Sequence, residues 1–313
     1  MTTELAATVT TTESRAPAGP RSAPAWSRHR IQGSVFRVLR WVVIAGFLIF
    51  TLVPFYYMAL LSLKPIESLL RNPDSLLVSP EEFTLQTYVD VLRSTASGGQ
   101  GFGGLLANSA FVALSSVFLA LLIGIPGAYA IARLPFVGRR QVSGLFLASY
   151  LFPGILMAIP LFVLFTRIGL RGSLIGLILV YTAQTVPVAI YMLRNYFETV
   201  PESIEEAGLM DGLGRLGVLR RISLRLALPS IMSTGLFVFM IAWNEFLFAL
   251  LFLVDRREHW TVSLGLSQLS GSVEVPTTVL MAGSVVLTLP IIIIFFATER
   301  LLTGGLTAGA EKG

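Results

Sequence analysis

Six long apolar stretches constrain this chain more than any other feature of its sequence. They are residues 41–63, 105–132, 143–165, 172–193, 226–254 and 275–298. A helix that crosses a hydrocarbon core about 30 Å thick needs about 20 such residues, and each stretch is long enough. The stretches are continuously apolar rather than alternating, which argues against membrane-spanning strands. The sequence therefore predicts an all-α, polytopic membrane protein with six transmembrane helices.

The composition supports this class and excludes several kinds of activity. Only 13% of the 313 residues are charged and the mean hydropathy is +0.76, whereas soluble domains are about 25% charged. The chain has no cysteine, which excludes disulfides, thiolate metal sites and cysteine nucleophiles. Its two histidines, His29 and His259, are too far apart for an HExxH zinc site, and neither lysine precedes Ser or Thr as a Walker A motif requires. We expect no cofactor, metal or nucleotide on this chain and no enzymatic activity.

The basic residues indicate how the chain is oriented in the membrane. Residues 1–40, 133–140, 194–225 and 299–313 contain 16 Lys and Arg, and the loops 64–93, 167–171 and 255–274 contain 7. The richer set is expected to face the cytoplasm, so both termini lie inside. Basic residues scattered between apolar runs also argue against a nucleic-acid partner. The predicted domains are a disordered cytoplasmic tail (1–40), a six-helix transmembrane domain (41–298) and a cytoplasmic C-terminal tail (299–313).

The loop between the fourth and fifth stretches, residues 201–225, carries the most specific pattern. Glu205 and Glu206 favour the positive N-terminal end of a helix. Asp211–Gly212 predicts a turn, and Arg215 lies four residues after Asp211, at the spacing of an ion pair. Neither glutamate has a basic residue four positions further on. The spacing is compatible with an unpaired acidic face that docks on a basic groove of a soluble protein, or with an ordinary helical surface loop.

Glu245 is the only acidic residue inside any of the six stretches. An acid at this depth is costly in lipid, so it is expected to face protein or water. With Trp243 and Asn244 it either lines a solute path, where aromatic faces and hydrogen-bonding groups recognise sugars, or bonds to a neighbouring helix for packing. Three further polar residues are weaker candidates for the path: Asn108, Tyr150 and Gln184.

The loop at 201–225 resembles the EAA loop of binding-protein-dependent ABC importer permeases, whose pattern is Glu-Ala-Ala, two residues, then Asp-Gly-Ala. The corresponding residues here are Glu206, Ala207, Gly208, Asp211, Gly212 and Leu213, with Gly208 and Leu213 in place of alanines. Further matches, typical of the maltose-type carbohydrate permeases, are Asn108-Ser109, Ala128-Tyr129-Ala130, Trp243-Asn244-Glu245-Phe246 and the tail Gly305–Gly313. The resemblance covers about residues 41–313.

The resemblance implies a type I importer permease fold and a set of partners in the cytoplasmic membrane of a prokaryote. These partners are a second, similar permease, two ATPase subunits that bind the ATP and Mg, and an external solute-binding protein. The loop, including Glu205, would seat in a cleft of an ATPase subunit. By this resemblance Glu206 meets an ATPase arginine and Gly212 permits the bend, while the C-terminal tail enters the ATPase dimer interface.

The same resemblance implies a sugar as the solute, such as a maltose- or trehalose-type glucoside. Glycerol-3-phosphate or its diesters are an alternative within the class. They need cationic groups along the path, and no Arg or Lys lies inside the six stretches, although the partner permease could supply them. An ion-coupled secondary transporter that uses Glu245 is another alternative, but it leaves the loop at 201–225 unexplained.

Overall fold

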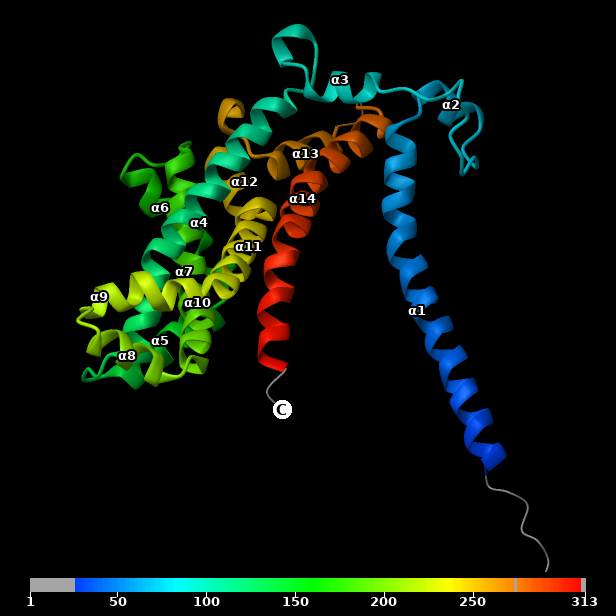
Figure 1. Ribbon diagram of the computed structural model, residues 1–313. Coiled ribbons are helices and arrows are strands. Elements are labelled where there is room, and N and C mark those ends of the chain that lie inside the picture. Colours follow the sequence, from blue (N-terminus) through cyan, green and yellow to red (C-terminus); the bar gives the residue numbers. More distant parts are fainter. Residues whose placement is uncertain (1–25, 273–274, 311–313) are drawn as a thin grey trace, which may run out of the picture. The chain divides into compact units, whose positions relative to one another are not determined.

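The computed structural model describes the backbone of residues 26–272 and 275–310, with the side chains of those residues except 26–35, 147, 150 and 300–310. The described residues form helices joined by turns, and no strand occurs among them (Figure 1). The chain divides into two units, one that ends at Phe55 and one that begins at Tyr56. The predicted all-α class is confirmed.

Helix α1 (Trp26–Ser62) supplies the described part of the first unit. It contains the first predicted stretch and begins at Trp26, well before residue 41, while the disordered tail over residues 1–40 stays a prediction. No proline lies between Trp26 and Arg40 to remove a backbone donor, and the helix continues through these residues. The side chains of residues 36–55 are exposed and mostly apolar, as expected for a helix surrounded by lipid. Residues 1–25 lie outside the described part of the chain.

The second unit contains the remaining helices. Its first half holds α2 (Ile66–Arg71), α3 (Gln86–Leu92), η1 (Thr95–Ser97), α4 (Phe102–Arg133), α5 (Arg139–Leu151), η2 (Gly154–Met157), α6 (Ala158–Arg167) and α7 (Leu174–Thr199). Its second half holds α8 (Glu202–Met210), α9 (Arg215–Val218), η3 (Leu219–Ser223), α10 (Leu224–Leu226), α11 (Leu228–Asn244), α12 (Leu247–Leu253), η4 (Arg257–His259), α13 (Val262–Ser270) and α14 (Thr277–Ala310). Of these, η3 is a π-helical turn.

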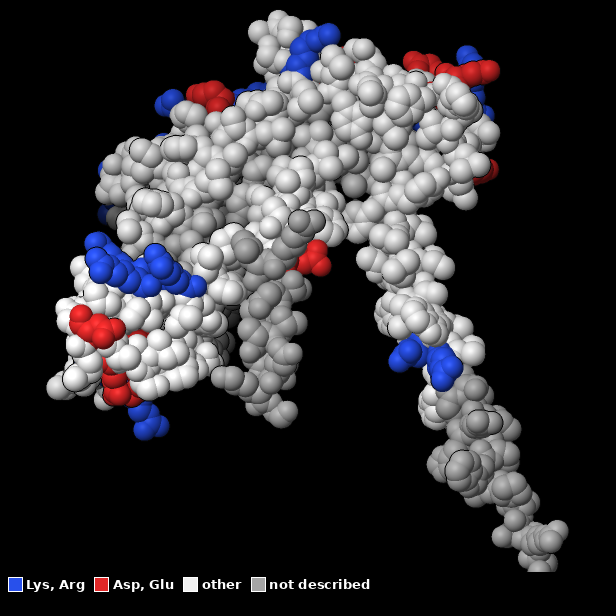
Figure 2. Space-filling model, in the orientation of Figure 1, with Lys and Arg blue, Asp and Glu red and all other residues white. Residues whose placement is uncertain are grey.

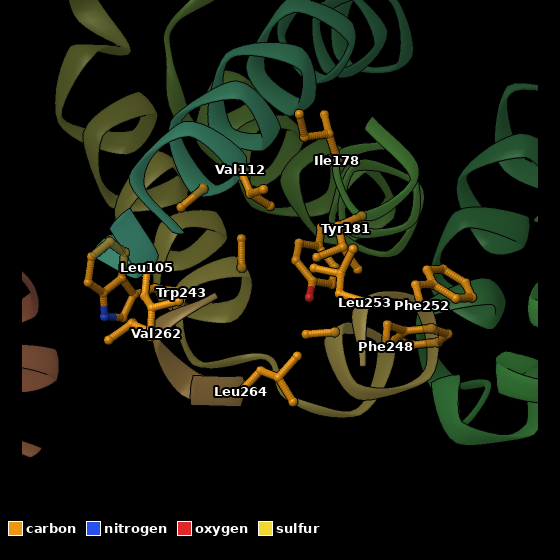
Figure 3. Close-up of a cluster of buried hydrophobic side chains, with 14 of the residues drawn as sticks. Leu105, Val112, Ile178, Tyr181, Trp243, Phe248, Phe252, Leu253, Val262 and Leu264 are labelled. Atoms are coloured by element: carbon orange, nitrogen blue, oxygen red, sulfur yellow. The ribbon is translucent and has the colours of Figure 1, made fainter. Parts of the chain in front are cut away.

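Helices α4, α7 and α11 form the centre of the second unit. Helix α4 packs along α7, and α11 packs against both of them and against α14. Figure 3 shows the buried cluster where they meet, which includes Val112 of α4, Tyr181 of α7 and Trp243 of α11. Phe248 and Phe252 of α12 close the cluster on a further side. This core aligns the helices that carry the candidate sites.

Four helices among the described residues are long and apolar enough to cross a membrane: Phe36–Ser62, Phe102–Arg133, Leu174–Thr199 and Thr277–Glu299. They correspond to the first, second, fourth and sixth predicted stretches. The third stretch, 143–165, is not one helix, because Pro153 drives Phe152 into an extended conformation and separates α5 from α6. Its membrane crossing stays a prediction.

The fifth stretch, 226–254, is also interrupted. A bend of 76° separates Arg215–Leu226 from α11, and counting this bent pair as one span gives five. A second break at Glu245 and Phe246 separates α11 from α12. The third and fifth stretches are therefore each made of more than one helix.

Candidate functional site

The coupling segment, residues 201–225, folds into two arms joined by a tight turn. The first arm is α8, and the second is the continuous run of α9, η3 and α10. Asp211 ends α8, and Gly212 follows with φ +85°, a left-handed conformation that glycine adopts without strain. The Leu213 amide donates to the Gly208 carbonyl at 3.1 Å and closes the turn. The turn predicted at Asp211–Gly212 is confirmed.

Glu205 lies between the arms and is only 5% exposed. Its carboxylate accepts hydrogen bonds from Tyr129 Oη at 3.1 Å and from Ser223 Oγ at 2.9 Å. It also lies 3.3 Å from Nε of Arg133, whose side chain is 6% exposed. Tyr129 and Arg133 belong to α4 and Ser223 to η3, so this Glu205 cluster joins the first arm to the second arm and to a central helix.

The expectation of an unpaired acidic face is therefore wrong for Glu205 and holds for Glu206. Glu206 and Ala207 are exposed, and Glu206 has no ion pair or hydrogen bond among the described side chains. The difference arises because Glu205 finds its partners on other helices, which spacing within α8 does not reveal. A buried carboxylate needs such partners, whereas an exposed one is hydrated.

Gly208 and Leu213 lie where the two arms pack. A β-carbon on Gly208 would stand 2.5 Å from Cδ1 of Ile222, so an alanine there would displace that methyl group. Leu213 is half-buried beside Gly208. The departures from the Ala-containing pattern therefore fall at this contact, where a glycine lets the arms approach closely.

The ion pair expected between Asp211 and Arg215 is not formed. Both side chains are exposed, and neither takes part in an ion pair within the described region. The left-handed Gly212 ends α8 between them, so they do not share one helix and lose the geometry of an i, i+4 pair.

The outer surface of the coupling segment combines charged and apolar side chains. Figure 2 shows basic side chains in a row over α9 and its continuation, with acidic side chains beside them over α8. The exposed basic residues are Arg215, Arg220, Arg221 and Arg225. Between the charges, Met210 is 88% exposed and Leu216 59% exposed. Exposed apolar groups surrounded by charges are typical of a protein-binding surface.

Glu245 occupies the break between α11 and α12. Its carboxylate accepts hydrogen bonds from the amides of Phe248 at 2.9 Å and Ala249 at 3.3 Å, and from Tyr181 Oη at 2.5 Å. Glu245 thus accepts hydrogen bonds from backbone amides that have no partner within α12, and its bond to Tyr181 links the start of α12 to α7. These contacts agree with the alternative in which Glu245 bonds to a neighbouring helix for packing.

The two residues before Glu245 differ in exposure, since Trp243 is buried and Asn244 is exposed. The Trp243 ring is buried, stacks on Phe239 with centroids 5.3 Å apart, and donates from Nε1 to the Leu287 carbonyl at 3.0 Å. Helix α14 therefore covers the ring in this structure, and a role of Trp243 in a solute path stays a prediction. Asn244 is exposed, and its Nδ2 donates to the Met240 carbonyl, which leaves Oδ1 free to accept.

Asn244 faces a cavity of about 410 Å³, here called the serine cavity. It is lined by Asn244, Phe246, Ser263, Leu266, Ser267, Ser270, Leu280, Met281, Ser284 and Leu287. Sequence reasoning did not find its four serines. Their signal was the spacing of Ser263, Ser267 and Ser270, which places three hydroxyls on one face of α13.

The remaining pathway candidates are placed apart from this cavity. Asn108 donates from Nδ2 to the carbonyls of Glu258 at 2.8 Å and Trp260 at 3.0 Å, and so holds η4 against α4. Gln184 is half-buried, with its amide facing Gly154 of η2. The side chain of Tyr150 lies outside the described residues. No group of three His, Asp or Glu side chains within the described ranges is arranged to hold a metal ion.

Comparison with known proteins gives one consistent family. Residues 120–304 match the family described as binding-protein-dependent transport system inner membrane component. The inner membrane ABC transporter permease protein YcjP of Escherichia coli is 38% identical over 270 residues, which cover 86% of this chain and 94% of that protein. The trehalose transport system permease protein SugB of Mycobacterium tuberculosis is 34% identical over 280 residues, which cover 88% and 98%.

A solved structure shares the fold. One chain of a bacterial ABC transporter involved in the import of the acidic polysaccharide alginate superposes with a TM-score of 0.74 and 23% identity. The superposition covers 91% of this chain and 99% of that chain. The type I importer permease fold expected from the sequence is confirmed.

Proposed function

Because this chain belongs to the family of inner membrane components of binding-protein-dependent transport systems, we propose that it moves a di- or oligosaccharide into the cell. The chain is a multi-pass permease subunit of an ABC importer in the cytoplasmic membrane. Its ATPase and binding-protein partners follow from the family. We further propose an assembly of one second permease and two ATPase subunits, in which ATP and Mg stay on the ATPases and this chain catalyses no reaction.

The geometry of the coupling segment supports the proposal that movement of the ATPase subunits drives a conformational change in this chain. Glu206, Met210 and Leu216 are exposed for docking, while Glu205 is buried beneath them and tied to Arg133 of α4. The second arm runs through a 76° bend directly into α11. A displacement of the segment is therefore passed to α4 through the Glu205 cluster and to α11 through the backbone, as a rigid-body change.

The serine cavity supports an uncharged, polyhydroxylated solute. Its lining combines four serine hydroxyls and the Asn244 amide with the ring of Phe246, and none of its lining residues is charged. Hydroxyl and amide groups exchange hydrogen bonds with sugar hydroxyls, and the ring offers an apolar surface. A phosphate ester would leave its charge unpaired in this lining. The relative SugB, a trehalose transport permease, supports the same solute class.

The contacts of Glu245 count against an ion-coupled mechanism. A coupling acid must exchange its proton or ion during each cycle, whereas this carboxylate holds two amides of α12 and the hydroxyl of Tyr181. Releasing them would uncap α12. The ATP-driven mechanism requires no such exchange.

The docking role of Glu206 is tested by Glu206→Lys in the tagged permease expressed with the other subunits of its transporter. We expect the variant to insert into the membrane, to lose co-purification of the ATPase and to lose sugar uptake, because the reversed charge meets a basic groove. Glu67→Lys is the matched control, since Glu67 is exposed on α2, far along the chain from the coupling segment, and should leave ATPase co-purification unchanged. Wild-type ATPase binding and solute-stimulated ATP hydrolysis in Glu206→Lys would contradict the proposal.

A further inference from the structure

A second cavity, of about 460 Å³, lies where the start of α5 meets the last turns of α7. We call it the arginine cavity. It is lined by Ile131, Arg139, Arg140, Ser143, Gly144, Tyr191 and Arg194. It shares no lining residue with the serine cavity, and none of its residues belongs to the coupling segment. The basic loops that bound it, 133–140 and 194–225, are those predicted to face the cytoplasm.

The charges around this cavity leave an excess of positive charge. Glu198 lies 2.9 Å from Arg194 and 3.8 Å from Arg139, so one carboxylate serves two guanidinium groups. Arg194 also donates to Ser143 Oγ, and Arg139 donates to the Ala132 carbonyl at 2.8 Å. Arg140 is exposed and makes no ion pair or hydrogen bond with any described side chain. Guanidinium groups bind phosphate oxygens through paired N–H donors, so this excess fits a phosphate group.

The surface that continues from the cavity along α5 is mostly apolar. Tyr191, 44% exposed, contributes an aromatic wall. From Gly144 the face of α5 continues through Ala148 to Leu151, which is 72% exposed, at the spacing of one helical face. Leu145 beside it is 68% exposed. Inorganic phosphate needs no such track, whereas a phospholipid needs one for its acyl chains.

We propose that the arginine cavity binds the phosphate of an anionic phospholipid from the cytoplasmic leaflet, with the acyl chains along the exposed face of α5. Arg140 supplies the unpaired charge, Arg139 and Arg194 flank it, and Tyr191 lies at the level of the head group. Basic pockets between transmembrane helices on this side of a membrane are suited to such head groups. The bound lipid fastens the start of α5 to the end of α7, next to the helix end that carries Arg133 of the Glu205 cluster.

Native mass spectrometry of the purified full-length chain tests this site with three probes. They are dioleoyl phosphatidylglycerol, dioleoyl phosphatidylcholine with the same acyl chains, and inorganic phosphate. We expect phosphatidylglycerol to bind more tightly than phosphatidylcholine, and Arg140→Gln to weaken its binding about fivefold, as expected for one basic residue near an anionic head group. Arg221→Gln removes an exposed arginine outside the cavity and should leave binding unchanged.

A second variant tests the space in the cavity separately from the charge of its arginines. A β-carbon on Gly144 meets no atom within 4 Å, so the side chain of Gly144→Leu starts in open space at the wall of the cavity. It should reduce phosphatidylglycerol binding although all three arginines remain. Equal binding of the two lipids, or equal effects of Arg140→Gln and Arg221→Gln, would overturn the site. Displacement of the lipid by millimolar phosphate would assign the cavity to a soluble phosphate and would overturn the proposal that its ligand is a phospholipid.

Discussion

Replacing Glu205 with glutamine tests whether its buried cluster holds α8 against α4. The carboxylate of Glu205 and the guanidinium of Arg133 are 5–6% exposed and lie 3.3 Å apart. Glutamine keeps the shape of the side chain but removes its charge, so Arg133 stays buried without a full counter-ion. Tyr129 and Ser223 also lose a charged acceptor, which weakens their hydrogen bonds.

The stability that Glu205→Gln loses follows from the burial of the Glu205–Arg133 ion pair. Removing one partner of a buried ion pair destabilises by about 3–5 kcal/mol. Arg133 retains its hydrogen bond to the Val200 carbonyl and its pair with the exposed Glu202, which place the cost near the lower end of that range. A loss of about 3 kcal/mol raises the fraction of molecules with α8 detached from α4 about 150-fold.

Hydrogen–deuterium exchange of the α8 amides measures this detachment, and sugar uptake by the assembled transporter measures its consequence. We expect faster exchange in Glu205→Gln and reduced uptake. Glu206→Gln is the matched control, because its side chain is exposed and unpaired, so exchange in α8 should not change. The double variant with Arg133→Gln should recover part of the lost protection, since it leaves no charge buried alone. Equal exchange in the two glutamine variants would refute the reasoning.

Three further predictions address the turn, the serine cavity and the break in the fifth stretch. Gly212→Ala should lower stability by about 1–2 kcal/mol, because residue 212 adopts φ +85° and a β-carbon is strained there; a melting temperature equal to wild type would count against the turn. Ser267→Phe should raise the KM for sugar uptake by filling the cavity, whereas Ser149→Phe, at an exposed position on α5, should not; equal KM values would exclude the cavity from the path. Glu245→Gln should lower the melting temperature and leave KM unchanged, because it weakens the cap of α12 by about 1 kcal/mol; a changed KM at unchanged stability would instead place Glu245 in the path.

The sequence by itself determines the membrane class, the all-α fold and the turn at Asp211–Gly212 within residues 201–225. These features depend on properties that lie along the chain: the length of each apolar stretch, the distribution of arginine and the preference of Asp211–Gly212 for a turn. Local chemistry also explains the break at Pro153, since a proline constrains the residue before it.

Only the tertiary structure decides which residues at each site are available to a partner or a solute. Glu205 and Glu206 are adjacent and chemically identical, yet one meets Tyr129, 76 residues away, and the other faces solvent. Trp243, Asn244 and Glu245 are likewise consecutive, but α14 covers the first, the serine cavity opens beside the second, and α12 engages the third. The physical reason is that burial and pairing depend on which helices pack together, and this packing joins residues far apart in the chain.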